Sequence, residues 1–431
     1  MNPILPNNYY IPDVEAHKMP DGRVYIYGSK DNSGDTEFCS TEYYAFSTAD
    51  MLHWENHGVI FNSTDKMYGL NTKLTLGAPD CLYINNRYYL YYYAYGNRMG
   101  VAVADEPTGP FQQLGSVSPA DGESIDPAIF QDDDGSVYYF WGQFQLRGGR
   151  LAEDMKTVLP ETIHENLLTE HEHGFHEGAS IRKINETYYM VYTDISRGRA
   201  TALGYATAKH PLGPYERQGI IIDNIGCDSE TWNNHGSIEE FNGAYYVFYH
   251  RSSQNSIYNR RVCVEKITIE KDGTINEVEM TSNGASEALD ATRTIPMTAL
   301  SKMKVKLPFD HFEPMRLEPV GDEEALTYTR SDDWIRLDNL DFRTGQNQVT
   351  VWASSMKPAK IEIYGKENHL LGECLISTTD SWENYLKFDA PVEKIEGIQT
   401  IWLKICTDDN SVGRLANIKN ISFDFIKECE R

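Results

Sequence analysis

The sequence lacks the features that would tie the protein to a membrane or to a nucleic acid. No run approaches the roughly 18 consecutive apolar residues of a membrane-spanning helix. Basic residues are outnumbered, 39 against 64 acidic ones, and they form no Lys/Arg-rich run. The formal net charge of −25 therefore argues against nucleic acids and anionic membrane surfaces as partners, and it leaves neutral, hydroxyl-rich ligands open.

Cysteine is also scarce. The seven cysteines are scattered, odd in number and without metal-ligand spacing, so buried free thiols are expected. The N-terminus, Met1-Asn2-Pro3-Ile4-Leu5, lacks the basic and long apolar regions of a signal peptide. A cytoplasmic location is therefore expected, unless a signal peptide was removed ahead of Met1 and the protein is secreted.

Aromatic residues, in contrast, are abundant, with 28 Tyr, 16 Phe and 7 Trp. They are often doubled in strand-like runs, as in Tyr88-Tyr89 and Tyr245-Tyr246, which favours an all-β chain. Tyr and Trp are also common surfaces on which sugars stack.

One hairpin pattern recurs along the first 290 residues. Asp13, Asp126 and Glu177 each open a strand, and a Tyr follows twelve positions later, across a tight polar turn. Two further copies open on Ala78-Pro79-Asp80 and Asn234-His235-Gly236. Turns spaced by roughly 50 to 65 residues suit one four-stranded sheet per repeat. The sequence thus predicts a five-bladed β-propeller over residues 1–290, with its innermost strands lining a central channel.

The hairpin rhythm stops around residues 281–307. We expect residues 291–307 to be a linker between two domains. From residue 308 to residue 431 short strands resume without the propeller register, which predicts a β-sandwich of the jelly-roll type.

The three carboxylates at one repeat position suggest glycoside hydrolysis. This reaction needs one carboxylic acid to protonate the leaving oxygen and a second carboxylate to act at the anomeric carbon. A third acidic group can raise a neighbour's pKa through like-charge repulsion. Asp13, Asp126 and Glu177 would face one another around the channel and fit these three roles. A single Asp or Glu at a strand end would more simply be a solvated cap.

The histidines allow two interpretations. His235 could be a hydrogen-bonded core residue near the axis, or it could hold a metal ion or a water chain in the channel. The His171, His173 and His176 cluster before Glu177 resembles a metal motif, although a loop wall is the better interpretation. Glu15 and His17, which alternate with Asp13, stay unassigned.

Several ordered segments resemble glycoside hydrolase family 43, a group of inverting five-bladed-propeller enzymes that act on arabinofuranosides and xylosides. They run in family order over about the first 290 residues: Tyr10-Ile11-Pro12-Asp13, Ala78-Pro79-Asp80, Ser124-Ile125-Asp126-Pro127, Tyr139-Phe140-Trp141-Gly142, His176-Glu177-Gly178-Ala179-Ser180, Asn234-His235-Gly236-Ser237 and Tyr249-His250-Arg251. Family members often carry a Trp before Ala-Pro-Asp, where this chain has Gly77.

The resemblance assigns roles to these residues. It implies Asp13 as the general base that activates water, Asp126 as the pKa modulator and orienting group, and Glu177 as the general acid. His235 matches an axial histidine near a bound calcium ion, which makes it both a substrate-binding and a metal-binding candidate. The other substrate-binding candidates in the matching segments are Asp80, Trp141 and Arg251.

The second domain resembles carbohydrate-binding module family 6. The resemblance implies sugar binding by two aromatics and an amide, Tyr328, Trp382 and Asn417. Asn420 stands where an aromatic residue is expected. The alternative is a structural domain that packs on the propeller, with Trp382 in its core.

The sequence as a whole therefore predicts an exo-acting, inverting α-L-arabinofuranosidase or β-xylosidase that acts on plant-derived oligosaccharides. The chemistry needs no cofactor, and a structural calcium ion could lie in the propeller channel or in the sandwich domain. The alternatives are a β-galactofuranosidase of the same family, a non-catalytic sugar-binding propeller, and a retaining five-bladed fructosidase. In the last group a Cys normally follows the acid, where this chain has Gly178. The sequence does not define the glycone or the oligomeric state.

Overall fold

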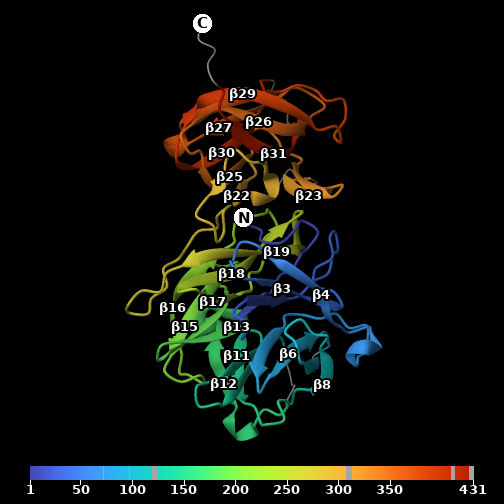
Figure 1. Cartoon of the computed structure of the whole chain (residues 1–431), viewed down its shortest axis with the longest axis vertical. Helices are drawn as coiled ribbons and strands as arrows, with labels where there is room; N and C mark the ends of the chain where they lie inside the picture. Colours follow the sequence, from blue (N-terminus) through green and yellow to red (C-terminus); the bar gives the residue numbers. More distant parts are fainter. Residues whose placement is uncertain (71, 97, 119–123, 307–312, 409–412, 427–431) are drawn as a thin grey trace.

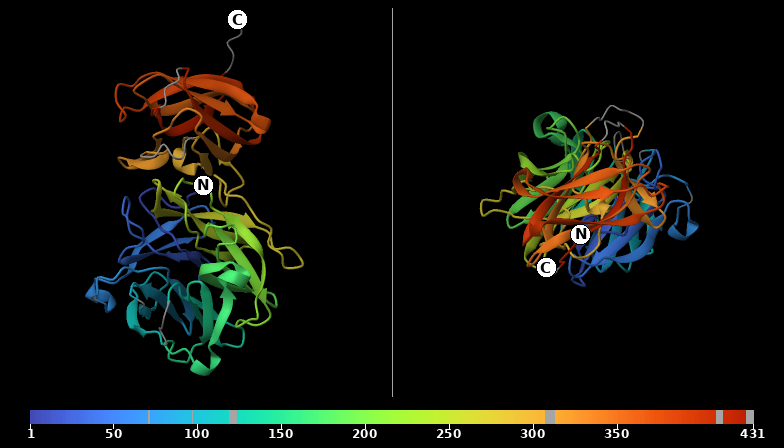
Figure 2. Two further views of the ribbon diagram at one scale, coloured as in Figure 1. Left: turned by 180° about the vertical axis from the view of Figure 1, so that it is seen from behind. Right: turned by 90° about the horizontal axis from the view of Figure 1, so that it is seen from above.

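The computed structural model describes residues 1–70, 72–96, 98–118, 124–306, 313–408 and 413–426. Two β-rich bodies follow one another along the long axis of the molecule (Figure 1). The view from above in Figure 2 shows the second body stacked over the first. Among the described residues, no helix is both long and apolar enough to cross a membrane.

The first body is a ring of five antiparallel sheets, or blades, which confirms the predicted five-bladed propeller. The first blade contains β1 (Glu15–Lys18), β2 (Val24–Gly28), β3 (Glu42–Thr48) and β4 (Glu55–Asn62), and the second contains β5 (Asp80–Ile84), β6 (Arg87–Ala94), β7 (Arg98–Ala104) and β8 (Gln112–Ser116). The third contains β9 (Ala128–Gln131), β10 (Val137–Trp141), β11 (Gln145–Arg150) and β12 (His164–Thr169). The fourth contains β13 (Phe175–Ile184), β14 (Thr187–Asp194), β15 (Ala202–Ala208) and β16 (Glu216–Asp223). The fifth contains β17 (Ser237–Phe241), β18 (Ala244–Ser253) and β19 (Ser256–Ile267). The connections carry three single turns, η1 (Lys66–Tyr68), η2 (Pro160–Thr162) and α1 (Glu170–His173).

Alternation along the middle strands builds the cores between the blades. In β10, Tyr138 and Phe140 belong to the apolar cluster shared with the fourth blade, whereas Tyr139 and Trp141 belong to the cluster shared with the second. Successive side chains of a strand point to opposite faces of the sheet, and here both faces are covered by neighbouring blades. That is why these strands read as continuous aromatic runs rather than as an apolar and polar alternation.

The N-terminal segment joins the ring to its last blade. Ile4 N donates to Val262 O over 3.1 Å, and Val264 N donates to the Asn2 side chain over 2.9 Å. Both partners lie in β19, so the start of the chain runs beside the outer strand of the three-stranded fifth blade. The ring is therefore closed by residues from both ends of the domain.

The second body is a curled β-sheet of a sandwich, as the sequence predicted, with the strand order β20-β25-β30-β27-β28-β29-β26-β31-β24-β23. Its strands are β20 (Leu289–Asp290), β21 (Ile295–Pro296), β22 (Lys302–Lys304), β23 (Arg316–Val320), β24 (Glu323–Thr327), β25 (Trp334–Asp341), β26 (Gln346–Ser354), β27 (Ala359–Tyr364), β28 (Leu370–Ile376), β29 (Leu386–Ile395), β30 (Ile398–Cys406) and β31 (Asn417–Asp424). The single turns η3 (Met297–Ala299) and η4 (Lys366–Asn368) complete it. In β27, buried Ile361 and Ile363 alternate with half-buried polar residues, the pattern of a strand with one face on a core.

Residues 291–307 were expected to be a linker, and in this the structure differs from the sequence prediction. Within this segment β21 pairs with β31 and β22 pairs with β25, and just before it β20 also pairs with β25. Ala291, Ile295, Met297 and Leu300 are buried in the sandwich core. Because the segment supplies both core side chains and ladder pairs, it belongs to the second domain.

The cysteines are buried free thiols, as predicted, in the described part of the chain: Cys39, Cys81, Cys227, Cys263, Cys374 and Cys406. Cys429 lies outside the described residues. No disulfide therefore contributes to holding the described strands together.

The two domains meet at a buried ion pair. Glu324 of β24 pairs with Arg261 of β19 and accepts a hydrogen bond from Tyr10 Oη over 2.7 Å. All three side chains are largely buried. Charges removed from water are tolerated only when they are paired, so the interface depends on this contact.

Candidate active site

A pocket of about 300 Å³ brings the three predicted catalytic carboxylates together. Asp13, Asp126 and Glu177 come from the first, third and fourth blades and line the same cavity. Its other walls are formed mainly by aromatic and polar side chains, namely Phe38, Tyr93, Tyr95, Gln143, His176, Trp232, Asn233, His235 and Arg260. Aromatic walls around a few polar groups are typical of a site for a small polyhydroxylated ligand.

Local backbone geometry aims the carboxylates into the pocket. Asp13 and Asp126 precede inner strands β1 and β9, and both have a positive φ, 56° and 51°. Non-glycine residues adopt this conformation at a cost, and such strain is concentrated at functional sites. Glu177 lies where the register between β13 and β14 shifts, and Gly178 beside it has φ +67°. A Cβ at Gly178 would stand 2.9 Å from the His235 ring, so only glycine fits there.

Arg260 sets the charge of Asp13. Its Nη1 donates to Asp13 Oδ1 over 2.9 Å, and both side chains are buried. Burial alone would raise the pKa of Asp13, but the Arg260 guanidinium, together with His235 and His250, outweighs it and lowers that pKa below its usual value. Asp13 is therefore an ionised carboxylate near neutral pH, as a general base must be.

Arg260 is itself held by Asp31. Its Nε and Nη2 donate to the two Asp31 oxygens, each over 2.9 Å, in a bidentate pair. Sequence reasoning missed Arg260. A signal for it exists: adjacent Arg260 and Arg261 in a strand must point to opposite faces of the blade, and since both faces are covered in a propeller, each cation needs an acidic partner.

Replacing Arg260 with Gln should move the acidic limb of the kcat/KM profile to higher pH. Without the guanidinium the pKa of Asp13 rises, so the base becomes protonated, and activity is lost, at a higher pH than in the parent enzyme. The profile is measured on an aryl glycoside. The position of the limb does not depend on how much of the variant is folded. Arg260→Lys keeps a cation and should shift the limb less. An unmoved limb in Arg260→Gln would contradict the role of Arg260.

The environment of Asp126 raises its pKa. Burial raises the pKa of Asp126 well above its usual value, and the neighbouring Glu177 and Asp13 carboxylates raise it further. One of its oxygens, Oδ2, accepts a hydrogen bond from Gly178 N over 3.1 Å, which fixes its orientation. The site thus combines a carboxyl group with a lowered pKa, Asp13, and one with a raised pKa, Asp126.

Glu177 faces the pocket and is oriented by Gln143. Gln143 Nε2 donates to Glu177 Oε2 over 2.8 Å, and the carboxyl group is only partly buried. Gln143 is a second residue that the sequence did not reveal, since it follows β10 in a connection without any repeat register.

His235 lies between two of the carboxylates. Its Nδ1 is 3.9 Å from both Asp13 Oδ1 and Asp126 Oδ2. Burial lowers the pKa of His235, so the ring is neutral near pH 7. The histidine predicted for the axis is thus part of the pocket, while its binding of a metal stays a prediction.

Three residues predicted to contact the substrate lie outside this pocket. Trp141 is 1% exposed and packs on Tyr139 in the core between blades. Arg251 is buried and donates to Leu300 O and Thr281 O near the domain boundary. Asp80 is buried and accepts from Ile129 N over 2.7 Å. All three were assigned from the segments that resemble the family, and the structure places them instead in buried packing and hydrogen bonds outside this pocket.

The wall beside Gly77 is filled by another aromatic residue. A Cβ at Gly77 would stand 2.8 Å from the Tyr93 ring, and Tyr93 itself lines the pocket. Tyr93 thus fills the space beside Gly77. Trp232, 39% exposed, provides a further aromatic surface in the lining.

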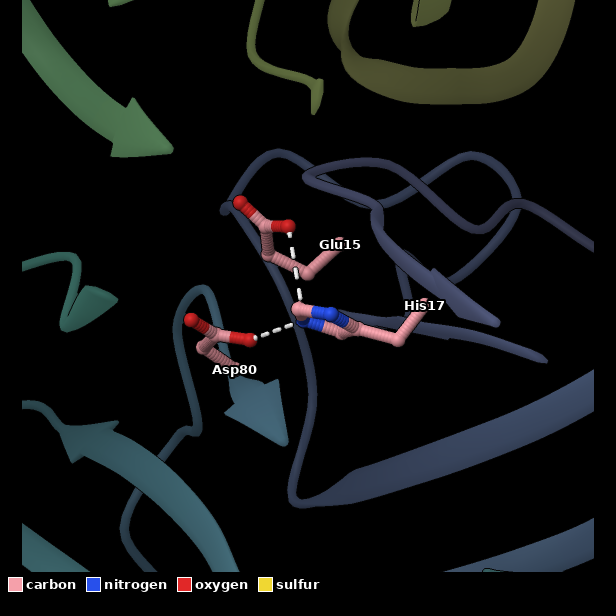
Figure 3. A group of neighbouring side chains, drawn as sticks. All are labelled: Glu15, His17 and Asp80. Atoms are coloured by element: carbon pink, nitrogen blue, oxygen red, sulfur yellow. Dashed lines mark hydrogen bonds and ion pairs between the residues drawn. The ribbon is translucent and has the colours of Figure 1, made fainter. Parts of the chain in front are cut away.

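A second cluster, Glu15, His17 and Asp80, is the one group among the described residues whose ligand atoms lie close enough together to be candidates for a metal ion (Figure 3). His17 Nε2 lies 2.6 Å from Asp80 Oδ1 and 3.7 Å from Glu15 Oε2. Arg182 also pairs with Glu15 over 3.0 Å. Calcium prefers six to eight oxygen ligands. This cluster offers one imidazole and only two carboxylates, and both carboxylates are already engaged, Asp80 with His17 and Glu15 with Arg182. It therefore does not fit calcium and is better described as a hydrogen-bonded network.

In the second domain the predicted sugar-binding residues do come together. Tyr328 and Trp382 both contact the Arg414 guanidinium, and Asn417 Nδ2 donates to Trp382 O over 3.3 Å. Asn420 lies in β31, where it pairs with Trp352 of β26. Arg414 was not foreseen.

A propeller pocket that gathers three carboxyl groups, one with a lowered and one with a raised pKa, between aromatic walls fits the site of a glycoside hydrolase. Comparison with known families supports this class directly. Residues 1–275 match the family described as glycosyl hydrolases family 43, and residues 315–425 match carbohydrate binding module family 6. Since the first match covers well over half of the chain, the protein belongs to glycosyl hydrolase family 43.

Curated relatives support the same assignment. A xylosidase/arabinosidase of Thermoclostridium stercorarium is 35% identical over 330 residues, which cover 66% of this chain and 68% of the relative. An arabinoxylan arabinofuranohydrolase of Bacillus subtilis (strain 168) is 25% identical over 445 residues, covering 89% of this chain and 85% of that protein.

Solved structures match one domain or both. CoXyl43, a β-xylosidase/α-arabinofuranosidase from a compost metagenome, was solved with xylotriose in a calcium-free form. It is 30% identical with a TM-score of 0.56, over 65% of this chain and 97% of that one. An arabinoxylan arabinofuranohydrolase from Bacillus subtilis, solved with cellotetraose, matches in fold over 99% of this chain and 97% of its own, with a TM-score of 0.55 and 23% identity.

Proposed function

We propose that this glycoside hydrolase is an exo-acting, inverting enzyme that removes α-L-arabinofuranosyl or β-xylosyl residues from plant-derived oligosaccharides. The observation that carries the proposal is the meeting of Asp13, Asp126 and Glu177 in one pocket of about 300 Å³. This volume is at the small end of ligand pockets, which suits a terminal sugar better than an internal stretch of chain. The relatives named xylosidase and arabinofuranosidase support xylose or arabinofuranose as the sugar that is released.

The proposed mechanism divides the work among the three acids. Asp13, held ionised by Arg260, takes a proton from a water molecule that attacks the anomeric carbon. Glu177, oriented by Gln143, gives a proton to the departing oxygen. Asp126 orients the backbone beside Glu177 and helps to keep a proton in the site. A water between base and sugar requires the Asp13 and Glu177 carboxyl groups to stand roughly 6.5–9.5 Å apart.

A panel of aryl α-L-arabinofuranoside, β-D-xyloside and β-D-galactofuranoside tests the substrate. Turnover of one of the first two is expected. Turnover of the third alone would favour the galactofuranosidase alternative, which a 29% identical β-D-galactofuranosidase of Aspergillus niger keeps open. No turnover of any of them would favour a sugar-binding propeller.

Proton NMR of the first product tests the stereochemistry. The product should appear with inverted anomeric configuration before mutarotation sets in, because the water attacks from the face opposite the leaving group. A product with retained configuration would contradict the role of Asp13 as a base and would indicate a nucleophile.

A further inference from the structure

Arg414 covers the aromatic pair of the second domain. Its guanidinium carbon lies 4.1 Å from the centre of the Tyr328 ring and 4.0 Å from the centre of the Trp382 ring. A second guanidinium, that of Arg316, lies 4.1 Å over Tyr328. Two guanidinium groups at this height would overlap on one face of a ring, so they cover opposite faces of Tyr328.

This arrangement covers both faces of the Tyr328 ring and one face of the Trp382 ring, on which a neutral sugar would otherwise stack. A sugar ring needs a bare aromatic face, and here Arg316 and Arg414 occupy the faces of Tyr328. The amide is occupied as well, since Arg414 Nε and Nη2 donate to Asn417 Oδ1 over 3.0 and 2.7 Å. The three groups expected to hold a neutral sugar are therefore engaged with Arg414 or with its neighbours.

Among the described residues the charge of Arg414 makes no close ion pair, although the Glu383 carboxylate nearby interacts with it electrostatically. Arg316 pairs with Glu318 over 2.7 Å, whereas Arg414 has no ion pair with any residue that the structure describes. Within the same described ranges its Nη1 makes no hydrogen bond, and this atom is not among the buried unsatisfied ones, so it is reached by solvent. A fixed guanidinium with an open donor edge is suited to a carboxylate.

We propose that the site around Arg414 binds glycans that carry a carboxylate, that is, chains bearing a uronic acid, and that Arg414 is the residue that excludes neutral sugars. The two aromatic rings and Asn417 hold the guanidinium in place, and its open edge receives the acidic group. The net charge of −25 opposes the approach of an acidic ligand, so its binding here depends on short-range contacts with the Arg414 guanidinium. The proposal does not rest on the activity proposed for the propeller.

Isothermal titration of the full chain tests the proposal. Glu177→Gln is used as the background so that the probes are not hydrolysed. The probes are xylotetraose and a xylotetraose carrying one glucuronic acid. The expected result is that the acidic probe binds more tightly than the neutral one by tenfold or more, and that binding weakens as salt is raised. Arg414→Ala should remove this preference and should gain affinity for the neutral probe, because it uncovers the two rings.

Arg293→Ala is the matched control, since it removes the same charge from an 85% exposed arginine and should leave both affinities unchanged. Oligosaccharide binding in the propeller pocket is common to all these variants, so it cancels when the affinity for one probe is compared between variants. Equal affinity of the parent for both probes, an acid preference that survives Arg414→Ala, or no binding of the acidic probe would each overturn the proposal. Thermal melts verify that Arg414→Ala is folded.

Discussion

Replacing Glu177 with Gln should nearly abolish hydrolysis of natural oligosaccharides while sparing substrates with good leaving groups. A general acid accelerates such a step by roughly 10²–10⁴-fold, and only a poor leaving group needs the proton. Glutamine keeps the size of the side chain, and its carbonyl can still accept the hydrogen bond from Gln143 Nε2. The measurement is kcat/KM across aryl glycosides of graded leaving-group pKa, together with one xylo- or arabino-oligosaccharide.

The decisive result is how kcat/KM depends on the pKa of the leaving group. This dependence should become much steeper in Glu177→Gln. It should stay as in the parent in Glu170→Gln, which changes a nearby and more exposed carboxylate that pairs with His176. An equal loss of kcat/KM with every leaving group would contradict the role of Glu177 as the general acid.

Replacing Asp13 with Asn should lower kcat/KM by a similar factor, roughly 10²–10⁴, on activated and natural substrates alike. The reason is that the attacking water loses its base, whatever group departs. Asparagine fits the same space and can still accept from Arg260 Nη1. Azide or formate should restore part of the activity on an activated aryl glycoside, since these anions attack without giving up a proton.

The rescued reaction carries its own control. The glycosyl azide formed by Asp13→Asn should have inverted configuration, and azide should not accelerate the parent enzyme. Asp21→Asn, which alters a turn carboxylate that accepts from Tyr25, should behave as the parent does. If Asp13→Asn slowed only the substrates with poor leaving groups, the roles of Asp13 and Glu177 would be exchanged.

The repeat register is why the carboxylate site could be predicted from the sequence. Asp13, Asp126 and Glu177 occupy one position in three hairpins, and closing the ring brings equal positions together. The resemblance to the family was less informative where both faces of a strand are buried. Trp141 reads like a channel residue, but its place in the alternation of β10 puts it in the core between the second and third blades.

Contacts between distant parts of the chain could not be predicted. Arg260 meets Asp13 across 247 positions, and nothing near either residue encodes that distance. The segment 291–307 was misjudged because the small polar residues before it suggested a connector, whereas Ile295 and Met297 enter the sandwich core. Arg414 was overlooked for a related reason, since its contacts with Tyr328 and Trp382 arise only when separate strands and loops converge.

The buried contact of Glu324 with Arg261 and Tyr10 limits how freely the two modules could be recombined in evolution. Tyr10 stands three residues before Asp13, and Arg261 follows Arg260, so the second domain touches the two segments that carry the base and its cation. A propeller separated from this sandwich would leave Arg261 without its carboxylate partner, next to the residues that carry the catalytic chemistry. The sandwich is therefore a folding partner of this propeller, and the pair is expected to melt in one cooperative transition and to be inherited together.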